Sequence, residues 1–119
     1  MKYYHITDKK NRKSILENGL IANELNEIYL FENKTVKNKR NGISNTIADC
    51  IAKNQLFLNE YVMFEIDPKG FKTPLINDAE TELSSCILWI LNQSKVGIDF
   101  IKDLGDFKTD FTPFIISKT

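Results

Sequence analysis

The sequence predicts one α+β domain, with five to seven short strands and two helices in the first half of the chain. Short runs of aromatic and β-branched residues recur along the chain and indicate strands. Two segments with apolar residues at helical spacing lie among the early runs. Turn residues separate the runs, most clearly at Asp67-Pro68-Lys69-Gly70. A chain of 119 residues can bury one core, so we expect a single domain over residues 1–119.

The first third of the chain alternates strand and helix signals. Residues 2–7 are rich in β-formers and predict the first strand, and Glu27 to Phe31 predicts the second. Between them, Asn11 to Asn18 predicts a short helix, with Gly19 at the C-cap position, where a positive φ is needed. Lys34 to Gly42 follows with four cations and almost no apolar residue, which is typical of a solvated loop.

The middle of the chain predicts one more helix and the clearest strand. A cap at Ser44 or Asn45 predicts a helix that continues to about residue 54. Glu60 to Ile66 is apolar and rich in β-formers, and the Asp-Pro-Lys-Gly turn ends it. Phe71 to Ile76 predicts a weaker strand, whose proline favours a position at the edge of a sheet.

The last third of the chain is less well defined by its pattern. Asp78 to Glu82 is acidic and fits a loop or a helical turn. Leu83 to Leu91 fits either a helix or a buried strand by its period, and its residue types favour a strand. Gly97 to Leu104 and Phe111 to Ser117 predict two further strands, with Gly105-Asp106 as the turn between them.

The composition excludes several classes of protein. Lys and Arg together number 16, as do Asp and Glu, so the overall charge gives no reason to expect binding to nucleic acid or to a membrane surface. No apolar run approaches the roughly 18 residues of a membrane span, and no signal-peptide core is present, so we expect a cytoplasmic protein. Cys50, Cys86 and the one histidine, His5, have no metal-ligand spacing, so we expect no metal site.

The order of the motifs resembles the ADP-ribosyltransferase domain of the histidine-tyrosine-glutamate branch, which includes the poly(ADP-ribose) polymerases and many small bacterial relatives. The resemblance covers roughly the first 70 residues. The motifs that carry it are, in order, Tyr4-His5-Ile6-Thr7, the helix ending Ser14-Ile15-Leu16-Glu17-Asn18-Gly19-Leu20, Ile28-Tyr29-Leu30, the helix with Ala48 and Ala52, and Tyr61-Val62-Met63-Phe64-Glu65-Ile66.

This resemblance implies a split pair of small antiparallel sheets with two short helices, and with NAD bound as a substrate in the cleft between the sheets. It implies that His5 binds the adenosine ribose, since imidazole can donate and accept hydrogen bonds from a rigid strand. Thr7 would line the same wall and orient the nicotinamide end. Tyr29 would enclose the nicotinamide and take part in catalysis. Without the resemblance, His5 would be read as a structural residue and Tyr29 as a cross-strand core aromatic.

The third residue of the family signature is a glutamate that stabilises positive charge on the ribose in the transition state. Glu82 is our first candidate because it directly precedes the expected late strand, with Glu80 second and Glu65 third. A strict count instead places Ser85 or Cys86 at this position.

The resemblance therefore implies a mono-ADP-ribosyltransferase that uses NAD to modify a protein or nucleic-acid acceptor, for example as a toxin or phage effector. If the glutamate is missing, the chain is a catalytically degenerate module that binds a nucleotide or a partner protein. A 2'-phosphotransferase-like activity is disfavoured because that branch uses several arginines and this chain has only Arg12 and Arg40. The basic segment Lys34 to Arg40 is either a solvated insertion or a contact for phosphate groups. An unrelated α+β interaction protein is the remaining alternative.

Overall fold

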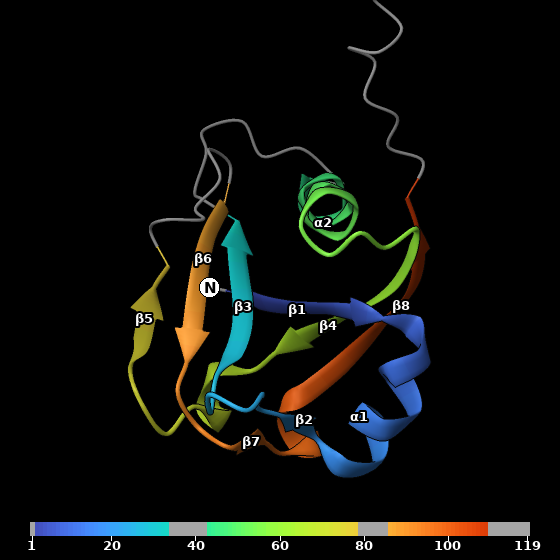
Figure 1. The fold of residues 1–119 in the computed structure, drawn as a ribbon. Coiled ribbons are helices and arrows are strands. Elements are labelled where there is room, and N and C mark those ends of the chain that lie inside the picture. The colour runs from blue at the N-terminus through green and yellow to red at the C-terminus, as the bar shows by residue number, and fades with distance from the viewer. Residues whose placement is uncertain (1, 34–42, 79–85, 110–119) are drawn as a thin grey trace, which may run out of the picture.

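A six-stranded antiparallel sheet organises the fold (Figure 1). The computed structural model describes residues 2–33, 43–78 and 86–109. The strands are β1 (Tyr3–Asp8), β2 (Leu20–Ile21), β3 (Ile28–Asn33), β4 (Glu60–Ile66), β5 (Leu75–Asn77), β6 (Cys86–Leu91), β7 (Lys95–Val96) and β8 (Ile101–Lys108). The helices are α1 (Arg12–Asn18) and α2 (Ile43–Asn54), with single 3-10 turns η1 (Lys9–Asn11), η2 (Pro68–Gly70) and η4 (Ile98–Phe100).

The large sheet consists of two blocks that are joined at a narrow point. Its strand order is β5-β6-β3-β1-β4-β8, and every neighbouring pair is antiparallel. β1 pairs with β4 along its whole length, from Tyr3 to Asp8. By contrast, β1 and β3 pair at one position only, Tyr4 opposite Phe31. Beyond that position the blocks β1-β4-β8 and β3-β6-β5 diverge, and Figure 1 shows their strands crossing at a steep angle.

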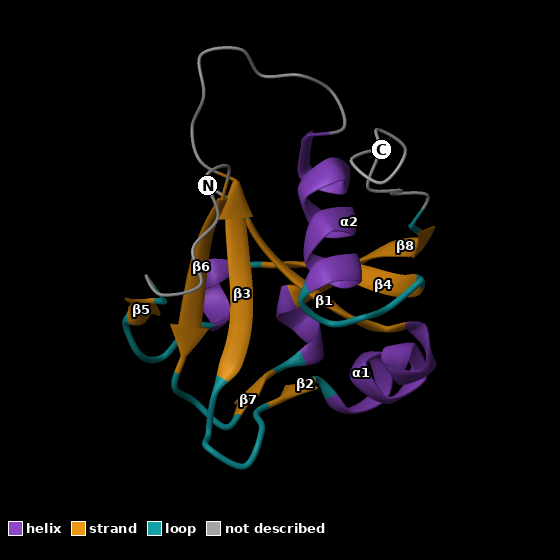
Figure 2. Cartoon of the chain, turned by 45° about the horizontal axis from the view of Figure 1, so that its top comes forward, coloured by secondary structure: helices purple, strands orange, loops and turns teal. Residues whose placement is uncertain are grey.

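Each face of the sheet has its own hydrophobic core. α2 lies over β1 and β4 and beside β3 (Figure 2), where Ala48, Ile51 and Ala52 pack against the sheet. The core on the opposite face joins Ile15 of α1 and Val96 of β7 to the buried side of β4 and β3. The α+β class with antiparallel sheets and two short helices is therefore confirmed.

Gly19 connects α1 to the two-stranded sheet formed by β2 and β7. Its φ is 88°, as expected for a helix C-cap, and its N–H donates to the Ile15 carbonyl. A Cβ at this position would lie 2.5 Å from the Val96 backbone oxygen, so no other residue fits without movement of the backbone. The lack of a side chain at Gly19 therefore allows β7 to lie beside the end of α1.

Most of the predicted elements within the described residues are confirmed, with three corrections. The predicted strand Gly97 to Leu104 begins only at Ile101, because Ile98–Phe100 forms the 3-10 turn η4. The predicted turn at Gly105-Asp106 is wrong, because β8 continues through both residues alongside the long strand β4. Leu104 and Gly105 together oppose Met63, and this β-bulge places Gly105 at a φ of 107°. The sequence also did not predict β2 and β7, which are two residues each. The predicted strand 111–117 and the basic segment 34–42 lie outside the described residues.

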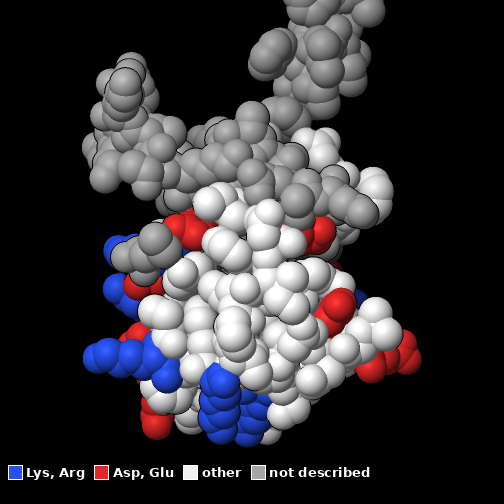
Figure 3. Space-filling model, turned by 90° about the vertical axis from the view of Figure 1, so that its left-hand side faces the viewer, with Lys and Arg blue, Asp and Glu red and all other residues white. Residues whose placement is uncertain are grey.

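Among the described residues, the sheet ends at β5 on one side and at β8 on the other. β5 is the edge strand that its proline predicted, although it covers only Leu75–Asn77. Figure 3 faces this edge and shows a broad area of uncharged atoms above a group of basic side chains. Ile76 is half exposed there.

Neither α1 nor α2 is long and apolar enough to cross a lipid bilayer, and this holds for the part of the chain that the structure describes.

Candidate functional site

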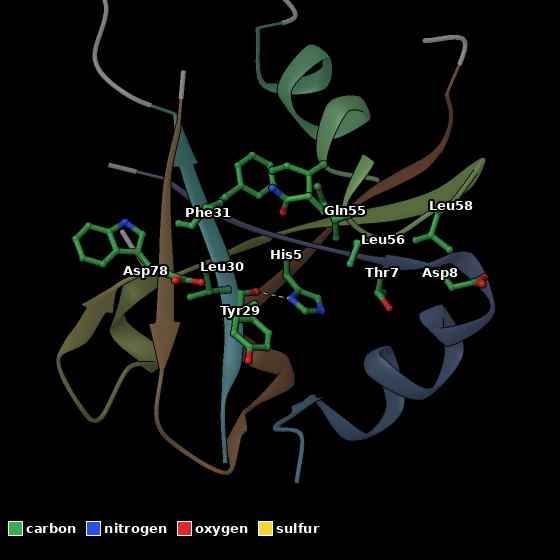
Figure 4. Close-up of a pocket in the computed structure, with 14 residues that line it drawn as sticks. His5, Thr7, Asp8, Tyr29, Leu30, Phe31, Gln55, Leu56, Leu58 and Asp78 are labelled. Atoms are coloured by element: carbon green, nitrogen blue, oxygen red, sulfur yellow. Dashed lines mark hydrogen bonds between the residues drawn. The ribbon is translucent and has the colours of Figure 1, made fainter. Parts of the chain in front are cut away.

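A cavity of about 610 Å³ lies where β1 and β3 diverge (Figure 4). β1 contributes one wall, and β3, with β6 and Asp78 directly after β5, contributes the other. The connection from α2 to β4 lies over the gap. The described lining combines aromatic and aliphatic side chains with a few polar groups, which is the usual character of a small-molecule site.

His5 spans the gap between the two strands. Its Nδ1 lies 2.8 Å from the backbone oxygen of Tyr29. A carbonyl can only accept, so Nδ1 carries the proton and Nε2 of the neutral ring is left as an acceptor. Burial lowers the pKa of His5, and the hydrogen bond to Tyr29 opposes this only partly, so the ring is neutral at pH 7. Figure 4 shows the second ring nitrogen directed away from Tyr29, toward the side of the cavity where Thr7 lies.

Tyr29 stands at the mouth of the cavity with 48% of its surface exposed. Its hydroxyl donates a hydrogen bond to Glu27, which raises the pKa of Tyr29, and partial burial adds to this rise. The turn before β3 holds Glu27 in place, because the Asn23 side-chain oxygen accepts from the N–H groups of Leu25 and Glu27. The ring is thus fixed at its polar end while its faces stay accessible.

Thr7 and Asp8 complete the wall from β1. The Thr7 hydroxyl oxygen accepts from Asn11 Nδ2 at 2.8 Å, which leaves its hydroxyl hydrogen to be donated to a ligand. Asp8 caps η1 by accepting from the Lys10 N–H. Both groups keep hydrogen-bonding capacity toward the cavity, since Thr7 can donate its hydroxyl hydrogen and Asp8 retains its second carboxylate oxygen as an acceptor.

The connection between α2 and β4 supplies Gln55, Leu56 and Leu58 to the lining. Backbone hydrogen bonds fix it: Gln55 and Leu56 both donate to the Ile51 carbonyl, and Leu58 donates to the Ala52 carbonyl. Phe57 lies between these residues at a φ of 58° and is 85% exposed. A bulky residue in the left-handed region is strained, so this segment stores strain beside the cavity.

Asp78 belongs to the cavity although the sequence analysis did not propose it as a site residue. Its position follows from strand pairing, since Ile76 of β5 pairs with Ile90 of β6, which pairs with Tyr29 of β3. Alternate residues of a strand share a face, so Asp78 lies on the same face as Ile76 and Tyr29. The Asp78 N–H extends the β5–β6 pairing by donating to the Leu88 carbonyl at 2.8 Å.

Of the residues proposed from the sequence, His5, Thr7 and Tyr29 are brought together at this cavity. Their proximity on neighbouring strands is confirmed, and their roles toward NAD stay predictions. Glu65 does not line the cavity, and its carboxylate lies 3.8 Å from the Lys2 amine.

The remaining candidates for the catalytic carboxylate position cannot be placed in the same way. Glu80, Glu82 and Ser85 lie outside the described residues. Cys86 begins β6 opposite Asn33, at the end of β3 that is remote from Tyr29.

Comparisons with known proteins leave the chain without a family assignment. No family model, no curated protein and no solved structure matches it. Within residues 2–33, 43–78 and 86–109, no three His, Cys, Asp or Glu side chains are grouped so that they could hold a metal ion. The functional inference therefore rests on the cavity and its side chains.

Proposed function

We propose that the chain has an ADP-ribosyltransferase-like fold and is a mono-ADP-ribosyltransferase that transfers ADP-ribose from NAD to a protein or nucleic-acid acceptor. The observation that carries the proposal is the meeting of His5 and Tyr29 across the split in the sheet, although they are 24 residues apart in sequence. This is the arrangement that the resemblance of their motifs implies for an NAD site.

The groups in the cavity match the chemistry of the ribose and nicotinamide parts of NAD. The neutral His5 ring offers Nε2 as an acceptor for a ribose hydroxyl. The Thr7 hydroxyl can donate to the oxygen of the carboxamide. Tyr29 offers an accessible aromatic face against which a nicotinamide ring can pack. The volume of about 610 Å³ lies within the range of small-molecule sites, which is roughly 300–1,000 Å³.

In the proposed reaction, the bond between nicotinamide nitrogen and ribose C1' breaks, and the electron pair leaves with nicotinamide as a neutral molecule. A nucleophilic atom of the acceptor then forms the new bond to C1' and loses its proton to a base. Positive charge develops on the ribose between these events, and a nearby carboxylate stabilises it. Glu82 remains our proposed source of that carboxylate, with Glu80 as the second choice.

The proposal predicts that NAD binding depends on both sides of the split. Calorimetric titration of NAD should show that His5→Leu and Tyr29→Ala each weaken binding, by about tenfold for the lost hydrogen bond at His5. Leu16→Ala is the control, since Leu16 is partly exposed on α1 and does not line the cavity. Failure of the wild type to bind NAD, or equal binding by all four proteins, contradicts the proposal.

Catalysis is tested separately by mass spectrometry of released nicotinamide. Glu82→Gln should lower the rate of release by about 10²–10³ while NAD still binds, because the charge acts mainly in the transition state. If the variant stays fully active, Glu80→Gln is the next variant to measure. If the wild type binds NAD but releases no nicotinamide with any acceptor, the chain is a binding module without chemistry.

A further inference from the structure

We infer that Glu27 and the ring of Tyr29 form a binding site for a guanidinium group at the mouth of the cavity, so that the acceptor is an arginine side chain of a protein. Binding at this site does not require NAD, but its role as the acceptor site rests on the proposed function. Three features of the described residues support it: a fixed carboxylate, the exposed aromatic ring beside it and the turn that holds the two together.

The Glu27 carboxylate is fixed at the mouth and keeps acceptor sites for a second partner. One of its oxygens accepts a hydrogen bond from the hydroxyl of Tyr29, which stands at the mouth. A carboxylate has about four acceptor sites, and this hydrogen bond uses one of them. Glu27 is only partly buried, so a ligand that arrives from solvent can reach it. Because carboxylate oxygens only accept, that ligand must donate N–H or O–H groups.

Tyr29 places an aromatic surface next to this carboxylate. Its side chain lines the cavity and is 48% exposed, so a group from solvent can lie against the ring while nicotinamide packs on the cavity side. The face of an aromatic ring is negative and attracts a cation, and the planar guanidinium of arginine also stacks on it. Since the hydroxyl of this ring is hydrogen-bonded to Glu27, one planar cation can contact the ring and the carboxylate together.

The turn before β3 holds the carboxylate in place before any ligand binds. The side-chain oxygen of Asn23 accepts from the N–H groups of Leu25 and Glu27, and the Asn23 N–H donates to the Glu27 carbonyl at 3.0 Å. The turn is also tied to the connection after β6, because the Asn92 amide donates to the Asn26 carbonyl at 3.2 Å. Groups that are already ordered lose less entropy on binding, which favours recognition of a single side chain.

The chemistry of these two groups distinguishes between classes of acceptor. A guanidinium group can stack on the ring and donate N–H groups to the carboxylate, whereas a lysine ammonium has no plane with which to stack. A carboxylate repels phosphate, so the backbone of a nucleic acid is disfavoured. In the transfer, a guanidinium nitrogen would form the bond to ribose C1' and its proton would pass to Glu27. Neutral nicotinamide would leave with the electron pair of the broken bond.

The test uses single side chains, so that the site is separated from NAD and from the rest of an acceptor. Nα-acetylarginine methylamide, which is a cation, and its neutral citrulline analogue are titrated into the wild type, Glu27→Gln and Tyr29→Leu, and the shifts of backbone amide signals in NMR spectra report binding. The wild type should bind the arginine compound about three- to tenfold more tightly than the citrulline compound. Both variants should lose most of this preference, and the affinity of Glu27→Gln for the citrulline compound should change less than about twofold.

Glu24→Gln is the matched control, because Glu24 is exposed in the same turn and the substitution removes the same charge. It should bind the arginine compound as the wild type does. If Glu24→Gln weakens binding as much as Glu27→Gln, the effect is one of overall charge and the inference is overturned. Equal affinity of the wild type for the two compounds, or tighter binding of a thymidine oligonucleotide at the same amides, also overturns it.

Addition of NAD separates this inference from the proposed function. With NAD present, mass spectrometry should find ADP-ribose on the arginine compound and none on the citrulline compound. If the arginine compound binds through Glu27 but NAD does not bind, the guanidinium site stands and the proposed function fails. If NAD binds and nicotinamide is released, but the arginine compound is not preferred, the proposed function stands and the inference is overturned. If both bind but arginine is not modified, the acceptor role of the site is overturned.

Discussion

In the block β1-β4-β8, the central strand β4 is almost completely buried from Tyr61 to Phe64, with exposures of 0–2%. In the block β3-β6-β5, by contrast, Tyr29 and Ile76 are about half exposed on the face that carries the cavity. The first block is also tied at its outer edge, where Arg12 forms ion pairs with Asp103 and Asp106 of β8. One block is therefore packed on both faces, and the other leaves part of one face exposed at the cavity.

This difference explains how the cavity combines rigidity with access. His5 and Thr7 belong to β1, which pairs along its whole length with buried β4. Tyr29 belongs to the more open block, and its position relative to His5 is set by the Tyr4–Phe31 pairing and by the hydrogen bond from His5. A site at the boundary between the blocks thus has one wall that is held by the core and one whose side chains stay accessible.

The largest expected effect comes from truncating the packed block. Phe64→Ala should lower the free energy of unfolding by about 3–5 kcal/mol, because Phe64 is fully buried and its ring would leave a cavity. Tyr29→Ala, in the open block, should cost less than about 1.5 kcal/mol, since its ring is half exposed. Urea unfolding followed by circular dichroism measures both, with Phe64→Leu as a milder variant should the alanine fail to fold. Similar costs for Phe64→Ala and Tyr29→Ala would show that the two blocks do not differ as described.

A smaller effect is expected at the outer edge of the packed block, and it depends on pH. Arg12 Nε and Nη2 bind the two Asp103 oxygens at 2.8 and 3.1 Å. Burial raises the pKa of Asp103, but the hydrogen bonds from Arg12 and the Gly105 N–H outweigh it, so the pKa lies below its ordinary value of 3.8. On acidification, Asp103 therefore takes up its proton at a higher pH in the unfolded chain than in the folded protein. The ionised Asp103 carboxylate thus stabilises the folded protein above about pH 4, and this stabilisation is lost as the pH falls further.

Arg12→Gln tests this assignment. The variant should lose about 1 kcal/mol at pH 7, and its stability should fall less than that of the wild type between pH 5 and pH 3. The control is Lys9→Gln, which breaks a more exposed ion pair with Glu60 and should have a smaller effect. If the stability of Arg12→Gln falls with acid as much as that of the wild type, other carboxylates cause the acid sensitivity.

The sequence predicted the features of the fold that depend on local pattern. Glu60–Ile66 is a strand because its apolar residues suit burial on both faces, and the observed bounds match the prediction. Gly19 ends α1 at a positive φ because a helix C-cap favours that conformation. His5 and Tyr29 could be placed on early strands for the same reason, since each lies within a run of β-formers.

The features that were missed depend on contacts between distant segments. A Gly-Asp pair predicts a turn when it is considered alone, but pairing of β8 with β4 keeps Gly105 within the strand as a bulge. β2 and β7 are too short for a periodic signal. Asp78 joins the cavity only because β5 pairs with β6 in one register, which the local sequence does not specify.

The smallest expected effect lies in the segment that connects α2 to β4 and covers the gap between the blocks. Phe57 holds a φ of 58° and is 85% exposed, so its backbone is strained while its ring gains little from burial. Phe57→Gly should therefore raise the free energy of unfolding by about 0.5–1 kcal/mol, since glycine adopts this conformation without a Cβ clash and the greater chain entropy of unfolded glycine offsets only part of the gain.

Phe57→Ala is the matched control, because it removes the ring but keeps the Cβ. Its stability should stay within about 0.5 kcal/mol of the wild type, so that the difference between the glycine and alanine variants isolates the backbone strain. Urea unfolding of the three proteins side by side is the measurement. If glycine and alanine are equally stable, the left-handed conformation is not strained here. The connection over the cavity would then store no backbone strain, and the contrast with the packed block would not extend to it.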